Sequence, residues 1–200
     1  MSAIGILAYG SLIDDPGVEI EPYIEARIRD IETPFSIEFA RSSATRDGAP
    51  TVVPVEDGGA PVKAQILVLK NQIDLGKAED LLWRRETRNE QTDKHYKKPL
   101  NPAPNRMVVE IVNDWQGLKY VLYTKLGANI PDVSADKLSE LAIRSARTEA
   151  GQEGKDGISY LISTMAHGIV TPLSGDYEKA ILMKTKTESL VEALEKLRNE

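Results

Sequence analysis

The chain has 200 residues, of which 41% are hydrophobic and 28% charged, which excludes a disordered chain and fits one folded domain. Its 25 basic and 31 acidic residues give a net charge of −6, so no nucleic-acid partner is expected, because a phosphate backbone would repel the chain. Cysteine is absent, which removes disulfides, thiolate metal ligands and thiol nucleophiles. No apolar run is long enough for a membrane span or a signal peptide, so no membrane partner and a cytoplasmic location are expected.

Short apolar runs predict strands in the first third of the chain. The run Ile4–Ala8 is followed at once by Gly10 and Ser11, which is typical of a central strand buried on both faces and then a sharp turn. The segment 18–31 has apolar residues without a clean period and is predicted to be mostly irregular. Further strands are predicted at 35–39, 51–55 and 62–69, and the short turns between them predict an antiparallel meander.

One helix and two more strands are predicted next. Asp74 is a suitable N-cap because Ala78, Leu81 and Leu82 follow it at helical spacing, and this helix is predicted to end near 86–89. Strands are predicted at 107–112 and 118–123, with a hairpin loop between them that has a glycine near its end.

The C-terminal third is predicted to be helical. Ser134 is a suitable cap for a first helix, 158–166 has a helical pattern, and 175–197 holds one or two amphipathic helices. Strands first and helices last favour an α+β fold. We expect a small closed or strongly curved, mostly antiparallel β-barrel with helices outside, in a single domain over 1–200 whose part 134–200 is a C-terminal helical layer.

Motifs of several common enzyme classes are absent from the sequence. There is no P-loop, no G-x-G-x-x-G and no G-x-S-x-G, so nucleotide, dinucleotide and α/β-hydrolase sites are not expected. His95 and His167 are the two histidines, and neither has metal-ligand spacing around it. Both are predicted to be surface or structural residues, and no metal site is predicted.

The tetrapeptide Tyr9-Gly10-Ser11-Leu12 is the first candidate functional segment. A strand that ends in Gly-Ser turns its backbone N–H groups outward, where they can bind a carboxylate or a developing oxyanion. The alternative is a plain strand-to-loop turn without a ligand.

Glu86, at the end of the first predicted helix, is the second candidate. Trp83 and the apolar residues near it can partly desolvate a carboxylate, which would raise its pKa toward the range of a general base. The alternative is an ordinary exposed glutamate paired with a neighbouring arginine.

Taken in chain order, these two signals resemble the γ-glutamylcyclotransferase fold family, including its plant-defence-type and ChaC-like branches. The resemblance rests on a strand that ends in Tyr-Gly-Ser-Leu, a meander, and a helix that delivers Arg85-Glu86, with Tyr96 ten residues later. Segment 46–50 is similar to an Arg-Gly-x-Pro stretch of ChaC-like members, and 154–161 weakly resembles their Gly-rich segment. The resemblance covers roughly residues 4–165; Thr87 stands where many members have glycine, and the tail beyond Gly168 has no counterpart.

The resemblance implies a reaction and a role for each matching residue. The α-amino group of a γ-glutamyl peptide or amine attacks its own γ-carbonyl, which releases 5-oxoproline and the amine without a metal or other cofactor. Glu86 would be the general acid/base, and Tyr9, Gly10, Ser11 and Leu12 would form the substrate loop. Arg46 would balance substrate charge, and Tyr96 and Tyr123 would line the cavity, although a turn arginine and packed tyrosines are the alternatives.

Two other functions stay open at this point. A non-catalytic module on the same fold could bind a small anion or a γ-glutamyl compound, and another acyl or amine transfer could use the same scaffold. The position of Glu86 discriminates: enclosure facing the 9–12 segment favours the enzyme, whereas a solvent-facing carboxylate paired with Arg84 or Arg88 favours the binding module. The sequence predicts neither the particular γ-glutamyl substrate nor the oligomeric state.

Overall fold

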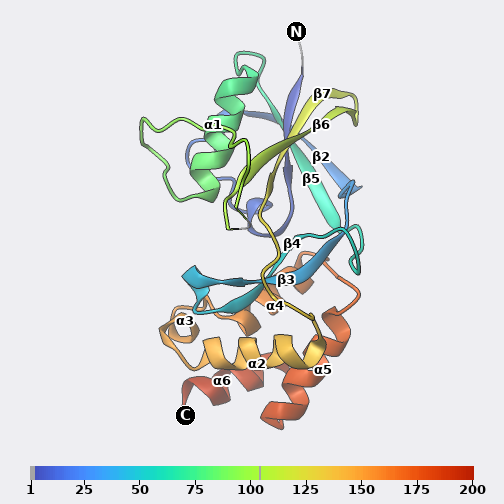
Figure 1. The fold of residues 1–200 in the computed structure, drawn as a ribbon, viewed down its shortest axis with the longest axis vertical. Helices are drawn as coiled ribbons and strands as arrows, with labels where there is room; N and C mark the ends of the chain where they lie inside the picture. The colour runs from blue at the N-terminus through green and yellow to red at the C-terminus, as the bar shows by residue number, and fades with distance from the viewer. Residues whose placement is uncertain (1–2, 104) are drawn as a thin grey trace. The chain divides into compact units, whose positions relative to one another are not determined.

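The apolar runs of the sequence form strands in two separate sheets, shown in Figure 1 for a computed structural model that describes residues 3–103 and 105–200. The chain divides into two compact units, each built from two stretches of sequence. Unit 1 comprises the residues up to Thr33 together with Lys63–Gly127, and unit 2 comprises Pro34–Val62 and Ala128–Glu200.

The elements of each unit follow in chain order. Unit 1 holds β1 (Ile4–Ala8), the 3₁₀ turns η1 (Gly10–Leu12) and η2 (Glu21–Tyr23), β2 (Ile24–Glu32), β5 (Lys63–Leu69), α1 (Leu75–Glu86), β6 (Val108–Trp115) and β7 (Leu118–Lys125). Unit 2 holds β3 (Ile37–Ser43), the 3₁₀ turn η3 (Ala44–Arg46), β4 (Ala49–Pro54), α2 (Ala135–Ala146), α3 (Glu149–Gln152), α4 (Gly157–Ala166), α5 (Ser174–Thr185) and α6 (Leu190–Arg198). None of the helices in the described part of the chain is both long and apolar enough to cross a bilayer.

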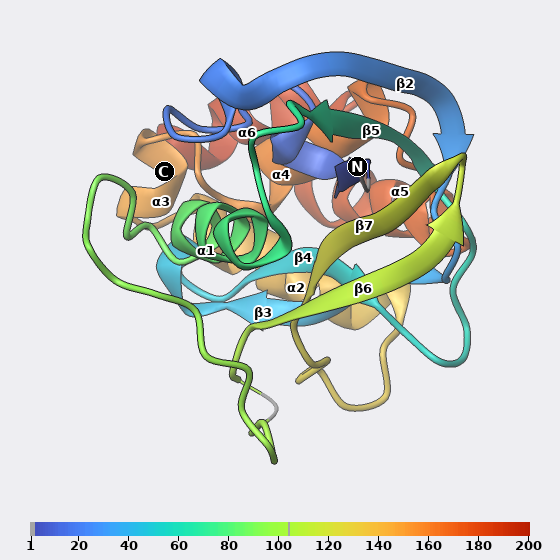
Figure 2. The same cartoon turned by 90° about the horizontal axis from the view of Figure 1, so that it is seen from above.

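The sheet of unit 1 has five strands in the order β2-β5-β1-β7-β6. Its central strand, β1, is antiparallel to β5 and parallel to β7, and it is buried along its whole length, as the continuous apolar run predicts. Gly5 permits close packing there, because a Cβ at this position would lie 2.4 Å from the Ile66 Cγ2 atom. Helix α1 packs on β1, β6 and β7 (Figure 2).

Helix α1 begins where the sequence predicts it. The Asp74 side chain accepts a hydrogen bond from the Lys77 N–H at 2.8 Å and so caps the helix. Ala78, Leu81 and Leu82 form the buried face and belong to the core of the five-stranded sheet. Burial of each leucine side chain contributes about 1.5–3 kcal/mol, which fixes the rotation of the helix and therefore the direction of its last residues.

Unit 2 is a two-stranded sheet covered by helices. Strands β3 and β4 pair antiparallel, and α2 and α4 pack on β4. Phe39 on β3 is fully buried, and its ring meets those of Tyr177 and Tyr160 edge-on at centroid distances of 5.2 and 6.3 Å. The side chains of Ser134, Asp156 and Ser189 cap α2, α4 and α6.

The chain is α+β, but the predicted barrel is wrong. In the described residues the five-stranded sheet is open: β2 and β6 are its edge strands, and β3 and β4 form a sheet of their own. The predicted meander breaks at β5, which pairs with β1 and β2 instead of β4. As a result the C-terminal helices pack on the β3–β4 sheet and not on the outside of a barrel.

Strand β2 occupies most of a segment that was predicted to be irregular. Its residues are half-buried or exposed, as befits an edge strand, so the period that marks a strand is weak in the sequence. Two irregularities in its pairing with β5 weaken the period further, and Asp30 has a φ of 56°.

Candidate active site

The end of helix α1 is fixed by a turn directly after Glu86. The Asn89 N–H donates to the Arg84 carbonyl at 2.8 Å, and the Arg88 N–H donates to the Arg85 carbonyl at 3.3 Å. This is a Schellman motif, in which Arg88 takes the left-handed position with a φ of 54°. Glycine usually occupies that position, so nothing in the sequence marks this turn except the end of the apolar spacing.

The tetrapeptide after β1 forms a tight turn. Gly10 has a φ of 65°, which favours glycine, and Gly10–Leu12 make a single 3₁₀ turn closed by the Ile13 N–H on the Gly10 carbonyl at 3.1 Å. Gly10 and Leu12 are buried and Ser11 is exposed. The Tyr9 hydroxyl donates to the Thr124 carbonyl on β7 at 3.4 Å. The predicted strand-to-turn geometry is therefore present at this position.

Arg85 joins this turn to the end of α1. The Asp15 N–H donates to the Ser11 carbonyl at 3.0 Å, and Asp15 in turn accepts at its own carbonyl from Arg85 Nη2 at 2.7 Å and Nε at 3.2 Å. Arg85 Nη1 donates to Glu86 Oε1 at 3.2 Å. A continuous chain of hydrogen bonds thus runs from Ser11 through Asp15 and Arg85 to Glu86.

Glu86 is the last residue of α1, and 22% of its side chain is exposed. Burial raises the pKa of its carboxyl above the ordinary value, and the Arg85 guanidinium opposes that rise. Its ion-pair partner is Arg85, not Arg84 or Arg88. A raised pKa makes a carboxyl better able to hold and return a proton, which is one requirement of a general acid/base.

Glu90 is a second carboxylate at this site, and it was not among the predicted site residues. Its Oε1 atom is enclosed and has no hydrogen-bond partner among the described residues. Gly17, with a φ of 91°, makes room for it: a Cβ at Gly17 would lie 2.3 Å from that oxygen and 3.1 Å from Arg85 Cδ. Residues 14–17, Asp-Asp-Pro-Gly, have the composition of a turn. That composition does not indicate that the turn contacts a carboxylate that follows helix α1.

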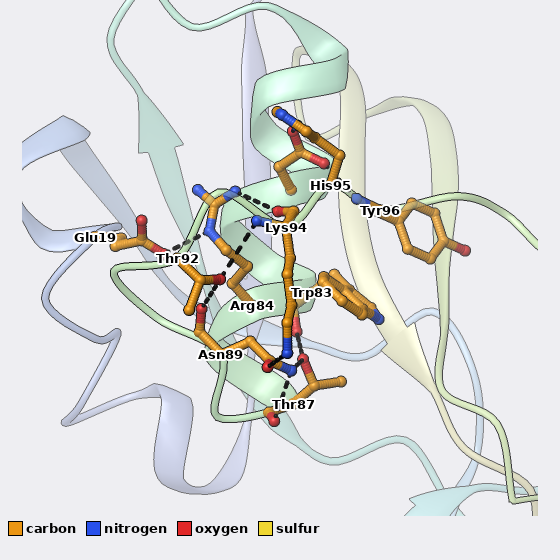
Figure 3. Close-up of polar contacts among 10 residues, drawn as sticks. Glu19, Trp83, Arg84, Thr87, Asn89, Thr92, Lys94, His95 and Tyr96 are labelled. Carbon is orange, nitrogen blue, oxygen red and sulfur yellow. Dashed lines mark hydrogen bonds and ion pairs between the residues drawn. The ribbon is translucent and has the colours of Figure 1, made fainter.

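The polypeptide after α1 is held by polar contacts, as Figure 3 shows. Arg84 is buried, and it donates from Nε to Glu19 Oε2 at 2.8 Å and from Nη1 to the Lys94 carbonyl at 3.0 Å. Lys94 Nζ donates to Asn89 Oδ1 at 2.6 Å. These contacts place Arg84 in a structural role, which leaves Arg85 as the arginine that faces the candidate site.

Tyr96 and Tyr123 lie around a different pair of charges. Lys98 Nζ donates to Glu110 Oε2 at 2.7 Å, and Glu110 on β6 is directly opposite Tyr123 on β7. Burial raises the pKa of both tyrosines, and Glu110 raises it further in each. The Tyr96 hydroxyl accepts from the Val109 N–H at 3.0 Å. The structure thus brings the two tyrosines to a shared Glu110–Lys98 pair.

Two residues singled out in the sequence have other surroundings. Arg46 belongs to unit 2, where its Nη1 donates to the Lys155 carbonyl at 3.2 Å and its guanidinium lies 5.0 Å from the Tyr160 ring centroid. His95 in unit 1 lies with its Nδ1 at 2.6 Å from Asp80 Oδ2 (Figure 3). Arg46 therefore has partners within unit 2.

Within residues 3–103 and 105–200, no group of three or more Asp, Glu or His side chains is arranged to hold a metal ion.

Comparisons with known proteins leave the chain without an assigned family. No protein-family model matches the sequence, and a search of curated proteins returns no significant match.

Proposed function

We propose that unit 1 catalyses an intramolecular acyl transfer of the γ-glutamylcyclotransferase type. In this reaction the α-amino nitrogen of a γ-glutamyl peptide or amine forms a bond to its own γ-carbonyl carbon. The bond from that carbon to the leaving nitrogen then breaks, and 5-oxoproline and a free amine are released. The observation that carries the proposal is the chain of hydrogen bonds from the Ser11 turn through Asp15 and Arg85 to Glu86.

Glu86 takes the role of proton carrier. It accepts the proton that the attacking ammonium must lose and passes it to the leaving nitrogen when the carbon–nitrogen bond breaks. The raised pKa supports this role, because a carboxyl of ordinary pKa holds a proton too weakly to return it near neutral pH. The Arg85 bond fixes the direction of the carboxylate, and the guanidinium charge favours its ionised form.

The remaining groups suit the charges of a γ-glutamyl substrate. The first N–H groups of a 3₁₀ turn have no acceptor within the turn, so those of Gly10 and Ser11 can bind the substrate carboxylate or the developing oxyanion. The carboxylate of Glu90, a half-buried residue, offers an acceptor to the substrate ammonium. Because the reaction is intramolecular, holding these two ends of the substrate is itself a large part of catalysis.

The test is release of 5-oxoproline by the purified full chain. Glutathione, γ-glutamyl dipeptides and γ-glutamylamines are supplied separately, and 5-oxoproline is followed by mass spectrometry. Glu86→Gln is expected to lower the rate by about 10²–10⁴-fold. Glu79→Gln is the matched control, because Glu79 lies on the same helix and burial raises its pKa too; its rate should stay at the wild-type level.

A non-catalytic binding module is the second candidate, and the Arg85–Glu86 ion pair favours it, since a carboxylate held by arginine is a weaker base. Calorimetric titration with the same compounds separates the two. Binding without 5-oxoproline release would replace the enzyme with the binding module. If the folded protein shows no binding and releases no 5-oxoproline, both functions are excluded.

A further inference from the structure

A groove on unit 2 has the shape of a small-molecule site. It lies among α2, α5 and α6 and has a volume of about 670 Å³, which is within the range of pockets that hold small organic ligands. Its lining includes two apolar side chains, Ile143 and Leu197, which are 8% and 3% exposed. All of its lining residues belong to unit 2 and lie between Glu140 and Glu200, so the groove is separate from the candidate active site of unit 1.

Four cationic side chains line the groove, and two of them are neutralised. Arg147 donates to Glu200 Oε2 from Nε at 3.0 Å and from Nη2 at 2.6 Å. Lys184 lies 2.7 Å from Asp136 and 3.3 Å from Glu140. These ion pairs neutralise the charges of Arg147 and Lys184, so neither side chain offers a free positive charge to a ligand.

The other two cations have no carboxylate partner in the described part of the chain. Lys196 donates to the Thr185 carbonyl at 2.8 Å, and the structure shows no hydrogen bond or ion pair of the Arg144 side chain to a described residue. The chain has 31 acidic and 25 basic residues, so acidic partners are plentiful elsewhere. The four cations and the three carboxylates paired with two of them leave a net charge of +1 beside an apolar surface, with Arg144 and Lys196 as the cations that a ligand can reach.

We propose that this groove binds a small organic anion with an apolar body and a carboxylate or phosphate group. Arg144 can donate two parallel N–H groups to such an anion, and Lys196 supplies a second positive charge. The apolar body of the ligand covers Ile143 and Leu197. The Arg147–Glu200 and Lys184–Asp136 pairs stay in place, because each already has its partner.

The test uses three ring compounds that differ in charge and anionic group: phenyl phosphate, benzoate and neutral benzamide. Each is titrated into the ¹⁵N-labelled full chain to concentrations above about 1 mM, where ligands of this size are expected to bind. Amide resonances from the last turn of α2 and from α6 should shift with the anions and not with benzamide. The anion that binds with the higher affinity, phenyl phosphate or benzoate, shows whether the groove prefers a phosphate or a carboxylate group.

Variants decide whether the two cations are responsible. Arg144→Gln with Lys196→Gln should weaken anion binding at least about tenfold, because each loses a charge-assisted hydrogen bond. Arg144→Gln alone serves if the double variant unfolds, since Arg144 is exposed and its side chain makes no hydrogen bond or ion pair with a described residue. Lys179 is an exposed cation on α5 that pairs with Asp176 and lies outside the lining of the groove. The control variant Lys179→Gln should therefore bind the anions with wild-type affinity. Equal shifts with benzamide, no shifts with either anion, or unchanged affinity in the variants would overturn the proposal.

Discussion

Glu38 of unit 2 and Glu86 of unit 1 differ in the number of hydrogen-bond donors that their carboxylates contact. Glu38 on β3 of unit 2 is 4% exposed, and its carboxylate accepts three hydrogen bonds. The donors are the Phe39 N–H (2.7 Å), the Thr171 hydroxyl (2.6 Å) and the Leu173 N–H (3.2 Å). Glu86 in unit 1 is more exposed but has a single polar partner among the described residues, Arg85, and burial raises its pKa.

A second pair of carboxylates shows the same difference. Asp156 of unit 2 is fully buried and accepts from the N–H groups of Ile158 and Ser159 and from the Ser159 hydroxyl. Glu90 of unit 1 is half-buried, yet one of its oxygens has no partner among the described residues. These carboxylates therefore differ in unused acceptor capacity and not in depth of burial alone: those of unit 2 have several hydrogen-bond donors, and Glu86 and Glu90 have few among the described residues.

The largest expected effect is on the structural side of this comparison. Glu38→Ala should lower the free energy of unfolding by about 3–5 kcal/mol, because three buried donors lose a charged acceptor. Glu86→Gln should change it by less than about 1 kcal/mol. Guanidinium unfolding followed by circular dichroism measures both changes. Tryptophan fluorescence would not serve, because the two tryptophans, Trp83 and Trp115, both belong to unit 1. Equal losses in the two variants would make Glu86 a structural group.

Two glycine substitutions separate backbone strain from displacement of Glu90. Gly17→Ala and Gly117→Ala each place a Cβ at a positive φ, so each should lower the free energy of unfolding by about 1–2 kcal/mol. The added Cβ meets both Glu90 Oε1 and Arg85 at Gly17 and meets nothing within 4 Å at Gly117. Only Gly17→Ala should therefore lower kcat/KM for 5-oxoproline release, by about tenfold to a hundredfold. Similar kinetics in both variants would remove Glu90 from the site.

The Schellman turn after Glu86 predicts a smaller, stabilising change. Arg88→Gly should raise the free energy of unfolding by up to about 1 kcal/mol, because glycine adopts the left-handed conformation without strain. Lys186→Gly, at the left-handed C-cap of α5, should give a similar gain in unit 2. Denaturant unfolding compares the two, and a loss of stability in Arg88→Gly would show that Arg88 makes a contact that stabilises the turn.

The smallest expected change is in the pH dependence of stability. Because burial raises the pKa of Glu86, the folded chain holds this proton more tightly than the unfolded chain does. The stabilisation is complete below the ordinary glutamate pKa of about 4.3 and is lost as pH rises through the raised pKa. Glu86→Gln does not titrate, so its stability relative to the wild type should increase over that interval. Parallel curves for the two proteins would contradict the raised pKa.

Local features of the fold were predictable from the sequence. Strand β1, helix α1 with its Asp74 cap and the Ser134 cap of α2 depend on residues close in sequence, and the structure shows all three. The sheet partners were not predictable in the same way. The strand β5 has the composition of a third meander strand, but its partners β1 and β2 are set by contacts between distant segments.

The candidate site was predicted only in part for the same reason. Glu86 and the Tyr9–Leu12 segment were identified from local signals and from a family resemblance. Gly17 and Glu90 were not, because their importance comes from a close approach of two loops that lie far apart in the sequence. The role predicted for Arg46 stays a prediction, and its segment belongs to unit 2.

The discontinuity of the two units has a consequence for synthesis of the chain. Residues 34–62, which hold β3 and β4, are translated before unit 1 can be complete at Gly127. The helices that cover β4 come from α2 and α4, which begin at Ala135 and Gly157. During translation, the β3–β4 hairpin therefore emerges before the helices that cover it, and its apolar residues stay exposed while the five-stranded sheet is completed.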